Sequence, residues 1–550
     1  MIKRLFQGQI NSIALAALLV AFSSLTSRFL GIFRDRILAG SFGAGDTLDV
    51  YYAAFRIPDL IFNLLVLGAL SAGFIPILSG LIKDTKLDFS VFKNGDNKDA
   101  WNLANYILNI LVFSLLIFSI LGMIFAPGLI GLIAPGFSPE KKELTVKLSR
   151  IMFLSPIFLG FSSVFGGILQ SFKRFFVYSL SPIVYNVGII LGVLYFVPLR
   201  NVFGGVEGLA WGVVFGAFLH MIVQVPLVFH LGFRYHFSFG LKDKNVRKIF
   251  KMMIPRVLSL GLSQINLLII TIMASTLASG SLSVFNFANN LESFPVSIFG
   301  ISFAVAAFPT LSALAFDRKK LVKNFSEIFR QILFFIVPST VLLLTLRAQI
   351  IRVIFGVGQF NWEDTILTMN TLAYFSISLF SQASIPLLVR MYYARHNSKT
   401  PFFIGFLSAI VNVLSLLYFA PRFGVAGLAL SFSIASIFNF VFLWMFLRVE
   451  IGDMDELRII YSSLKFSISA LFAGIGIQGM KILIAQYVNM TTFLGILSQG
   501  FFAGLFGIII YLSVASLLKS EELFYFWRAL KRRLPWNKVE TGDQGEARGI

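Results

Sequence analysis

Long apolar stretches separated by short polar segments recur along nearly the whole chain. A helix needs roughly 20 mostly apolar residues to cross a bilayer, and many of these stretches reach that length. The pattern therefore predicts an all-α polytopic membrane protein. Its about fourteen transmembrane helices lie near 9–38, 48–81, 101–126, 144–171, 176–197, 207–231, 252–278, 283–315, 329–346, 364–393, 401–420, 425–447, 460–484 and 493–518.

Several predicted spans are longer than a bilayer requires and contain proline or glycine, such as Gly31, Pro58 and Pro295. Such interruptions free backbone groups, which must then face protein or a wet cavity rather than lipid. The Pro-rich stretch 126–137 is too short to span, and we expect it to form an interfacial half-helix.

Short motifs occur twice in the same order. The run Gly205–Ala210 (GVEGLA) returns as Gly424–Ala429 (GVAGLA), and Phe74–Ser79 resembles Ala307–Ser312. About six spans separate the copies, so both have the same orientation, as in duplicated transporter bundles. We therefore predict two six-helix lobes related by an internal repeat, followed by two C-terminal helices and a basic tail. Their boundaries are 1–232, 233–450, 451–518 and 519–550.

Composition agrees with a membrane protein. The chain is 57% hydrophobic and only 13% charged, with a mean hydropathy of +0.83. These values exclude a soluble enzyme, because soluble domains carry about a quarter charged residues. Cysteine is absent, the four histidines are scattered, and no Gly-rich phosphate loop is present. We therefore expect no enzyme activity, no catalytic residue, no cofactor and no metal site.

The net charge of +20 lies in short loops between apolar runs, so it indicates membrane orientation rather than nucleic-acid binding. With the N-terminus inside, the inner segments hold about thirty lysines and arginines, against about eight outside. Lysine and arginine concentrate on the cytoplasmic side of membrane proteins. We predict that both termini are cytoplasmic.

Ionisable groups inside a span are costly and usually functional. Four spans carry polar stripes at helical spacing, and they are the first two spans of each repeat. The stripes contain Ser24, Ser27, Arg28, Gly31 and Asp35; Asp49, Tyr52, Arg56, Asp59 and Asn63; Arg256, Ser259, Ser263 and Asn266; and Asn286, Asn289 or Asn290, Ser293 and Ser297. We expect them to line one hydrophilic cavity. On an ideal helix Arg34 points away from the first stripe.

The alternative is that these groups only hold helices together, with Arg28 paired to Asp35 or Asp49, and Arg56 paired to Asp59. Against this alternative, arginines outnumber carboxylates in the first two spans. Guanidinium groups bind phosphate through two donors at once and stay charged at any depth. An anionic substrate is therefore favoured over a cationic one.

Several runs of the chain resemble the MurJ (MviN) lipid II flippase family of the multidrug/oligosaccharidyl-lipid/polysaccharide exporter superfamily. They are Ser27–Asp35 (SRFLGIFRD), Ala53–Pro58 (AAFRIP), Gly68–Pro76 (GALSAGFIP) and Tyr392–Pro401 (YYARHNSKTP). The resemblance extends over nearly the full length. It implies a transporter that moves undecaprenyl-diphosphate-linked peptidoglycan precursor from the inner to the outer leaflet by alternating access. The implied location is the bacterial cytoplasmic (inner) membrane.

The resemblance also implies roles for particular residues. Family arginines that contact the diphosphate fall on Arg28 and Arg34, the acidic residue of the second helix falls on Asp49, and a further basic residue falls on Arg56. Two usual arginine positions are occupied by Phe62 and Asn290 instead, and Arg256 is a candidate replacement. The expected substrate-binding residues are Arg28, Arg34, Asp49, Arg56, Arg256 and Asn290.

The expected partners are lipid II, membrane lipids and cell-wall synthesis proteins, with no nucleic acid. Asn412 falls on a sodium-ligand position of some family members, but its span carries no acidic partner, so the membrane potential is the simpler driving force. Three alternatives stay open. They are a flippase for another polyprenyl-diphosphate-linked oligosaccharide, a cation or drug exporter, and a non-transporting membrane scaffold of the same fold.

Overall fold

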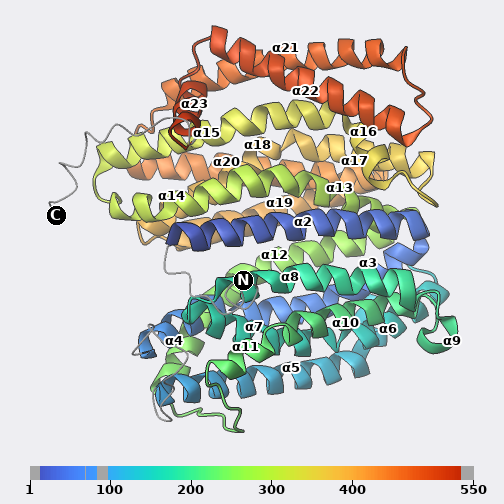
Figure 1. The fold of residues 1–550 in the computed structure, drawn as a ribbon, viewed down its shortest axis with the longest axis vertical. Coiled ribbons are helices and arrows are strands. Elements are labelled where there is room, and N and C mark those ends of the chain that lie inside the picture. Colours follow the sequence, from blue (N-terminus) through green and yellow to red (C-terminus); the bar gives the residue numbers. More distant parts are fainter. Residues whose placement is uncertain (1–12, 69, 83–96, 534–550) are drawn as a thin grey trace. The chain divides into compact units, whose positions relative to one another are not determined.

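The computed structural model describes residues 13–68, 70–82 and 97–533. All regular structure in these ranges is helical (Figure 1). Among the described residues, eleven helices are long and apolar enough to cross a membrane, or up to twelve if the bent pair Trp362–Ile377 and Leu379–Ala394 is one span. Each of the fourteen predicted segments coincides with helix in its described part. The predicted count of fourteen is consistent with the structure but is not confirmed by it.

The chain divides into two compact units, which we describe separately. Unit 1 extends to Phe294 and adds Ile351–Phe375 and Phe402–Phe438, and unit 2 holds Pro295–Ile350, Ser376–Pro401 and the chain from Asn439. This division by packing differs from the predicted division by repeat, since the first span of the second repeat (252–278) and the start of its second span (to Phe294) lie in unit 1. The predicted lobe boundaries stay a prediction.

The helices of unit 1 come mostly from the first half of the chain. They are α2 (Ile13–Phe42), α3 (Asp46–Phe62), η1 (Asn63–Leu67), η2 (Leu70–Phe74), α4 (Ile75–Leu81), α5 (Lys98–Ile133), α6 (Pro139–Met152), α7 (Ser155–Ser171), α8 (Phe175–Leu191), η3 (Gly192–Phe196), α9 (Arg200–Phe203), α10 (Glu207–Ile222), α11 (Val225–His230), α12 (Lys244–Ser275) and α13 (Ser281–Pro295, whose last residue opens unit 2).

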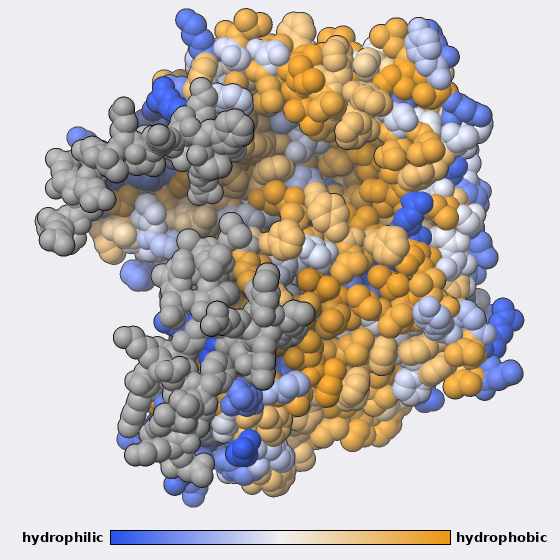
Figure 2. Space-filling view, in the orientation of Figure 1, coloured by the Kyte–Doolittle hydropathy of each residue, from blue (hydrophilic) through white to orange (hydrophobic). Residues whose placement is uncertain are grey.

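Four further helices contain the points at which the chain passes between the units: α16 (Arg347–Phe355), α17 (Trp362–Ile377), α19 (Lys399–Phe423) and α20 (Val425–Ile451). Unit 2 also contains η4 (Val296–Ile301), α14 (Ser302–Ala313), α15 (Arg318–Thr345), α18 (Leu379–Ala394), α21 (Glu456–Ala485), α22 (Phe493–Leu517) and α23 (Glu521–Arg533). On the face shown in Figure 2, hydrophobic residues cover most of the helical surface, as expected for a chain solvated by lipid.

The η elements are π-helical turns, which widen a helix locally and often occur at functional sites. The turn at Asn63–Leu67 begins thirteen residues before Pro76, and the turn at Val296–Ile301 begins thirteen residues before Pro309. Because Pro76 and Pro309 occupy the same place in the repeated motif, the two turns do as well.

Prolines inside the helices free carbonyl groups four residues earlier, and side chains of neighbouring helices satisfy several of them. Ser149 Oγ donates to Ala54 O, which lies four residues before Pro58, at 3.1 Å. Tyr511 Oη donates to Phe334 O, four residues before Pro338, at 2.7 Å. The expectation that freed backbone groups face protein is confirmed for these positions.

The predicted half-helix at 126–137 is wrong, because α5 continues through Pro127 to Ile133. The carbonyl that Pro127 leaves without a partner belongs to Met123, and it accepts a hydrogen bond from Arg150 Nε at 3.1 Å. The substitute donor removes the main penalty of a proline in a helix, so only Ala134–Phe137 forms a turn.

Two helices of unit 1 pack backbone against backbone. A Cβ atom on Gly188 of α8 would lie less than 3.0 Å from Gly216 of α10, and one on Gly192 would lie equally close to Gly212. Small residues spaced four apart allow such close approach in membranes, where apolar side chains gain little by leaving lipid. These glycines fix the position of α8, which carries part of the polar site below.

Candidate functional site

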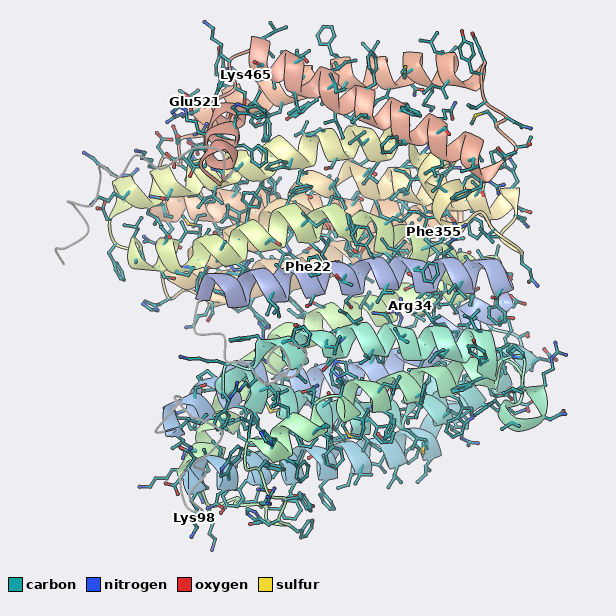
Figure 3. The ribbon with its side chains drawn as sticks, in the orientation of Figure 1. Phe22, Arg34, Lys98, Phe355, Lys465 and Glu521 are labelled. Atoms are coloured by element: carbon teal, nitrogen blue, oxygen red, sulfur yellow. The ribbon has the colours of Figure 1, made fainter. Side chains whose placement is uncertain are left out.

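A polar cluster in unit 1 joins α2, α8 and α13. Arg34 donates from Nη2 and Nε to Asp35 Oδ1 at 2.8 and 3.0 Å, and from Nη1 to Asn186 Oδ1 on α8 at 3.2 Å. The other oxygen of Asp35 accepts from Asn290 Nδ2 on α13 at 2.8 Å. Arg34, labelled in Figure 3, therefore contacts Asp35 of the first polar stripe, although on an ideal helix it points away from that stripe.

The cluster has no net charge. The Asp35 side chain is only 2% exposed, whereas 22% of the Arg34 side chain stays accessible. A buried carboxylate needs such pairing, because an isolated charge in a low-dielectric interior is strongly disfavoured. Arg34 thus compensates the charge of Asp35. Two of the five N–H donors of Arg34 have no partner in the described part of the chain.

Arg56 of α3 points toward α12 and α13 of the same unit. Its Nε donates to Thr271 Oγ1 at 2.8 Å and its Nη2 donates to Asn286 Oδ1 at 3.2 Å. Both partners are neutral, so they orient the guanidinium without cancelling its charge. Asp59, one turn along α3, carries a charge that interacts with Arg56, but the two side chains form no ion pair within 4.0 Å.

Two of the predicted basic residues have no such partners. Arg28 is half-buried on α2 and Arg256 is exposed on α12, and neither makes a hydrogen bond or ion pair among the described residues. The anticipated pairing of Arg28 with Asp35 or Asp49 does not occur, since Arg34 occupies Asp35. Arg28 is therefore a half-buried guanidinium whose donors are available for a ligand, and Arg256 is an exposed one.

Asp49 is used differently from the other predicted site residues. It is buried, and its carboxylate accepts from Gly280 N at 2.8 Å, from Ser283 N at 2.9 Å and from Ser283 Oγ at 2.7 Å. The two N–H donors belong to Gly280, directly before α13, and to Ser283 in its first turn; such groups have no partner inside the helix and lie at its positive end. Asp49 of α3 is thus a cap for another helix.

The same end of α3 carries a second connection. Asp46 accepts from Lys141 Nζ of α6 at 2.7 Å, and Ser279 Oγ, in the turn before α13, also donates to Asp46. Together Asp46 and Asp49 fasten the start of α13 to α3 and α6.

The two positions at which family arginines are missing have distinct surroundings. Asn290 donates to Asp35, as described, and so keeps a polar contact without a charge. Phe62 packs against the hydrophobic core of unit 1 that includes Phe74, Phe165 and Phe172. Position 290 therefore carries a neutral polar group in this chain, and position 62 carries an apolar one.

Asn412 of α19 lies against Asn266 of α12, and the two amides form a hydrogen bond. The Oδ1 atom of Asn412 is buried and has no partner among the described residues. No group of three or more His, Cys, Asp or Glu side chains that could hold a metal ion exists among those residues.

Sequence reasoning missed Asn186, Thr271 and Glu292 as members of the polar interior. Glu292 of α13 is buried, and its Oε1 atom has no hydrogen-bond partner in the described part of the chain. Asn186 and Thr271 are polar residues within apolar spans, which is a signal that the sequence contains. Glu292 is next to Ser293 of the polar stripe in its span but lies off that stripe, so helical spacing does not single it out.

Comparison with known proteins places the chain in a family. Residues 38–498 match the family model described as lipid II flippase MurJ. The probable lipid II flippase MurJ of Buchnera aphidicola subsp. Baizongia pistaciae is 31% identical over 435 residues, which cover 78% of this chain and 82% of the relative. The probable lipid II flippase MurJ of Thermotoga maritima is 30% identical over 499 residues, covering 90% and 95%.

Solved structures agree. A lipid II flippase MurJ in an inward closed conformation matches with a TM-score of 0.73 and 25% identity, covering 94% of this chain and all of that one. An inward-facing multidrug resistance MATE transporter of the MOP superfamily matches with a TM-score of 0.63 at 14% identity, covering 80% and 99%, and shows the shared fold alone. On the family match and the relatives above, the chain belongs to the lipid II flippase MurJ family.

Proposed function

We propose that this chain moves lipid II, the undecaprenyl-diphosphate-linked peptidoglycan precursor, from the inner to the outer leaflet of the cytoplasmic membrane. The observation that carries the proposal is the family match over residues 38–498, extended by relatives that cover up to 92% of the chain. Alternating access fits the fold, which is shared with MOP-superfamily transporters.

The polar interior of unit 1 suits a diphosphate. Arg28 and Arg56 supply guanidinium groups with no carboxylate hydrogen-bonded to them, and planar guanidinium donors match phosphate oxygens in pairs. Arg34 of the same unit has two further donors without a partner among the described residues. We assign the substrate-contacting role first to Arg28 and Arg56, with Arg34 and Asn290 positioned by Asp35, and a supporting role to Arg256 on α12.

Asp49 acts at another step. Because it caps α13 and does not present its oxygens to the interior, we assign it to the contact that closes one end of unit 1. Release of substrate on that side then requires the hydrogen bonds of Asp46 and Asp49 at the start of α13 to break. The membrane potential supplies the drive, since each charge that moves across it changes in free energy by about 2.3 kcal/mol per 100 mV.

The topology that accompanies this function is a multi-pass inner-membrane protein with both termini in the cytoplasm. It rests on the excess of lysine and arginine in the inner segments. Cell-wall synthesis proteins stay predicted partners.

The test is complementation in bacterial cells depleted of their own lipid II flippase, combined with an accessibility assay for labelled lipid II in the outer leaflet. We expect the wild-type chain to rescue growth and flipping, and Arg28→Ala to abolish both while the protein stays folded in the membrane. Arg422→Ala is the matched control, because Arg422 is an exposed arginine at the end of α19.

Three results of this test would contradict the proposed function or the assigned site. A wild-type chain that inserts but does not flip lipid II contradicts the proposal and favours the scaffold alternative. Rescue that depends on a different polyprenyl-diphosphate headgroup favours the oligosaccharide alternative, for which the neutral Asn290 and the apolar Phe62 are the specific departures. Full activity of Arg28→Ala removes the assigned site.

A further inference from the structure

Unit 2 contains a pair of basic side chains that the proposed transport path does not use. Lys481 lies four residues before the end of α21, and Arg347 is the first residue of α16. The Lys481 ammonium donates to Thr345 O at 2.9 Å, two residues before Arg347, and the two cations repel each other. Both side chains are partly exposed.

Hydrogen bonds between side chains of neighbouring helices hold the backbone at Lys481 in place. Gln499 of α22 donates from Nε2 to Lys481 O at 2.9 Å, and Gln349 of α16 donates to Gln499 Oε1 at 2.7 Å. Gly500 of α22 allows Gln349 to approach, since a Cβ atom there would lie 3.2 Å from the Gln349 side chain. Three elements of unit 2, α16, α21 and α22, are therefore tied together at this point.

The two cations lack a counter-charge. Neither forms an ion pair with any carboxylate in the part of the chain that the structure describes, although ten ion pairs occur there. Thr345 O takes one of the three Lys481 donors, and Leu344 O takes one Arg347 donor at 3.5 Å. Most of the donors of the two side chains therefore have no hydrogen-bond partner in the described part of the chain.

Part of this arrangement has a purely structural explanation, because a lysine at a helix C-terminus stabilises the last carbonyls. Lys481 does so for α15, which ends at Thr345. Arg347 likewise reaches Leu344 O in the last turn of α15, at the longer distance of 3.5 Å, so each cation has one carbonyl partner and neither has a counter-charge. Two like charges close together repel each other, and a bound anion offsets this repulsion.

The position of the pair indicates where the anion comes from. Around Lys481 the surface of α21 is apolar and exposed, with Ile482 66% and Leu483 55% accessible, which is a face suited to lipid. Tyr487, 85% accessible, follows at the helix end, where aromatic residues mark the headgroup level. In the proposed orientation this end of α21 is the outer one, and it holds two of the few basic residues on that side.

We propose that Arg347 and Lys481 form a binding site for the phosphate group of a membrane lipid in the outer leaflet. The guanidinium and the ammonium share the phosphate oxygens, Thr345 O and Gln499 hold Lys481 in place, and the acyl or polyprenyl chain lies along the exposed apolar face of α21. The leaflet assignment rests on the proposed orientation. The chemistry of the site does not depend on transport.

The experiment uses the full-length purified chain in detergent and counts bound lipid by native mass spectrometry. The probes are dioleoyl-phosphatidylglycerol, undecaprenyl diphosphate, and dioleoylglycerol, which lacks phosphate. The test variant is Arg347→Gln with Lys481→Gln, and the matched control is Arg200→Gln, an exposed outer arginine of unit 1. Because charge-assisted hydrogen bonds are worth about 1.5–3 kcal/mol, we expect roughly tenfold weaker phosphate-lipid binding in the double variant.

The two lipid probes distinguish the source of the phosphate. If the double variant loses binding of both lipid probes, the site binds phospholipids in general. If it loses binding of undecaprenyl diphosphate alone, the site binds the transported lipid. Equal binding of both by the double variant and the wild type, or equal binding of dioleoylglycerol, overturns the proposal. Arg347→Lys with Lys481→Arg retains both charges and must retain binding, which separates a lost site from a misfolded protein.

This test is independent of the proposed function. Arg28→Ala, which we expect to abolish flipping, must leave the Arg347 and Lys481 site intact. A chain that flips nothing yet binds phosphate lipids here contradicts the transport proposal only.

Discussion

The pairing of Arg34 with Asp35 allows the structural and the substrate-binding roles of an arginine to be measured separately. Arg34→Gln removes the charge that compensates Asp35, whose side chain is 2% exposed. Removing one partner of a fully buried ion pair costs about 3–5 kcal/mol, because the other charge stays behind without compensation. Since the Arg34 side chain is 22% exposed and partly screened, we expect about 3 kcal/mol.

A second substitution restores neutrality. Arg34→Gln combined with Asp35→Asn leaves no charge in the cluster, and the amide oxygen introduced at position 35 can still accept from Asn290 Nδ2. We expect the double variant to recover most of the lost stability, since well-packed neutral replacements of buried ion pairs are often tolerated. If Arg34 also contacts the diphosphate, lipid II flipping stays lost in the double variant.

The assay combines thermal unfolding in neutral-lipid nanodiscs with the outer-leaflet accessibility of labelled lipid II. Arg28→Gln is the matched control, because Arg28 has no partner among the described residues and its loss should change stability by less than about 1 kcal/mol. A single Arg34→Gln variant as stable as the wild type would refute the assigned charge balance. Wild-type flipping by the double variant would show that Arg34 is only structural.

Three further predictions follow from the packing. Gly188→Ala should destabilise unit 1 by about 1–3 kcal/mol in thermal unfolding, because its Cβ would overlap Gly216, whereas Gly405→Ala, with open space around it, should not. Arg330→Met should lower stability by about 3–5 kcal/mol, since it leaves the buried Glu522 carboxylate unpaired, while Lys320→Met, which breaks an exposed pair, should have little effect. A hydrogen bond from Arg458 lowers the pKa of Glu521, so the stability that Glu521 gives the start of α23 is present near neutral pH and is lost as the pH falls below about 4. Trp527 fluorescence should report this loss, and Glu521→Gln should weaken its pH dependence; an unchanged profile would contradict the assignment.

The amino-acid sequence by itself determined the fold class, the positions of the predicted spans and the family. These features depend on local quantities, namely the length of apolar stretches, the spacing of charges and short motifs such as Tyr392–Pro401. Helical periodicity also grouped Arg56 and Asn286 into polar stripes, and these two side chains form a hydrogen bond in the structure, because a period of 3.6 residues fixes which side chains share one side of a helix.

Tertiary structure decided which partner each polar side chain meets. Asp35 contacts Arg34 and Asn290 instead of Arg28, and Asp49 caps α13, which begins 232 residues later in the chain. Periodicity gives the face of one helix, but it carries no information about which remote helix packs there. Glycine contacts such as Gly188 with Gly216 set that choice, and so do side chains that satisfy carbonyls freed by proline. Both act between helices, through space.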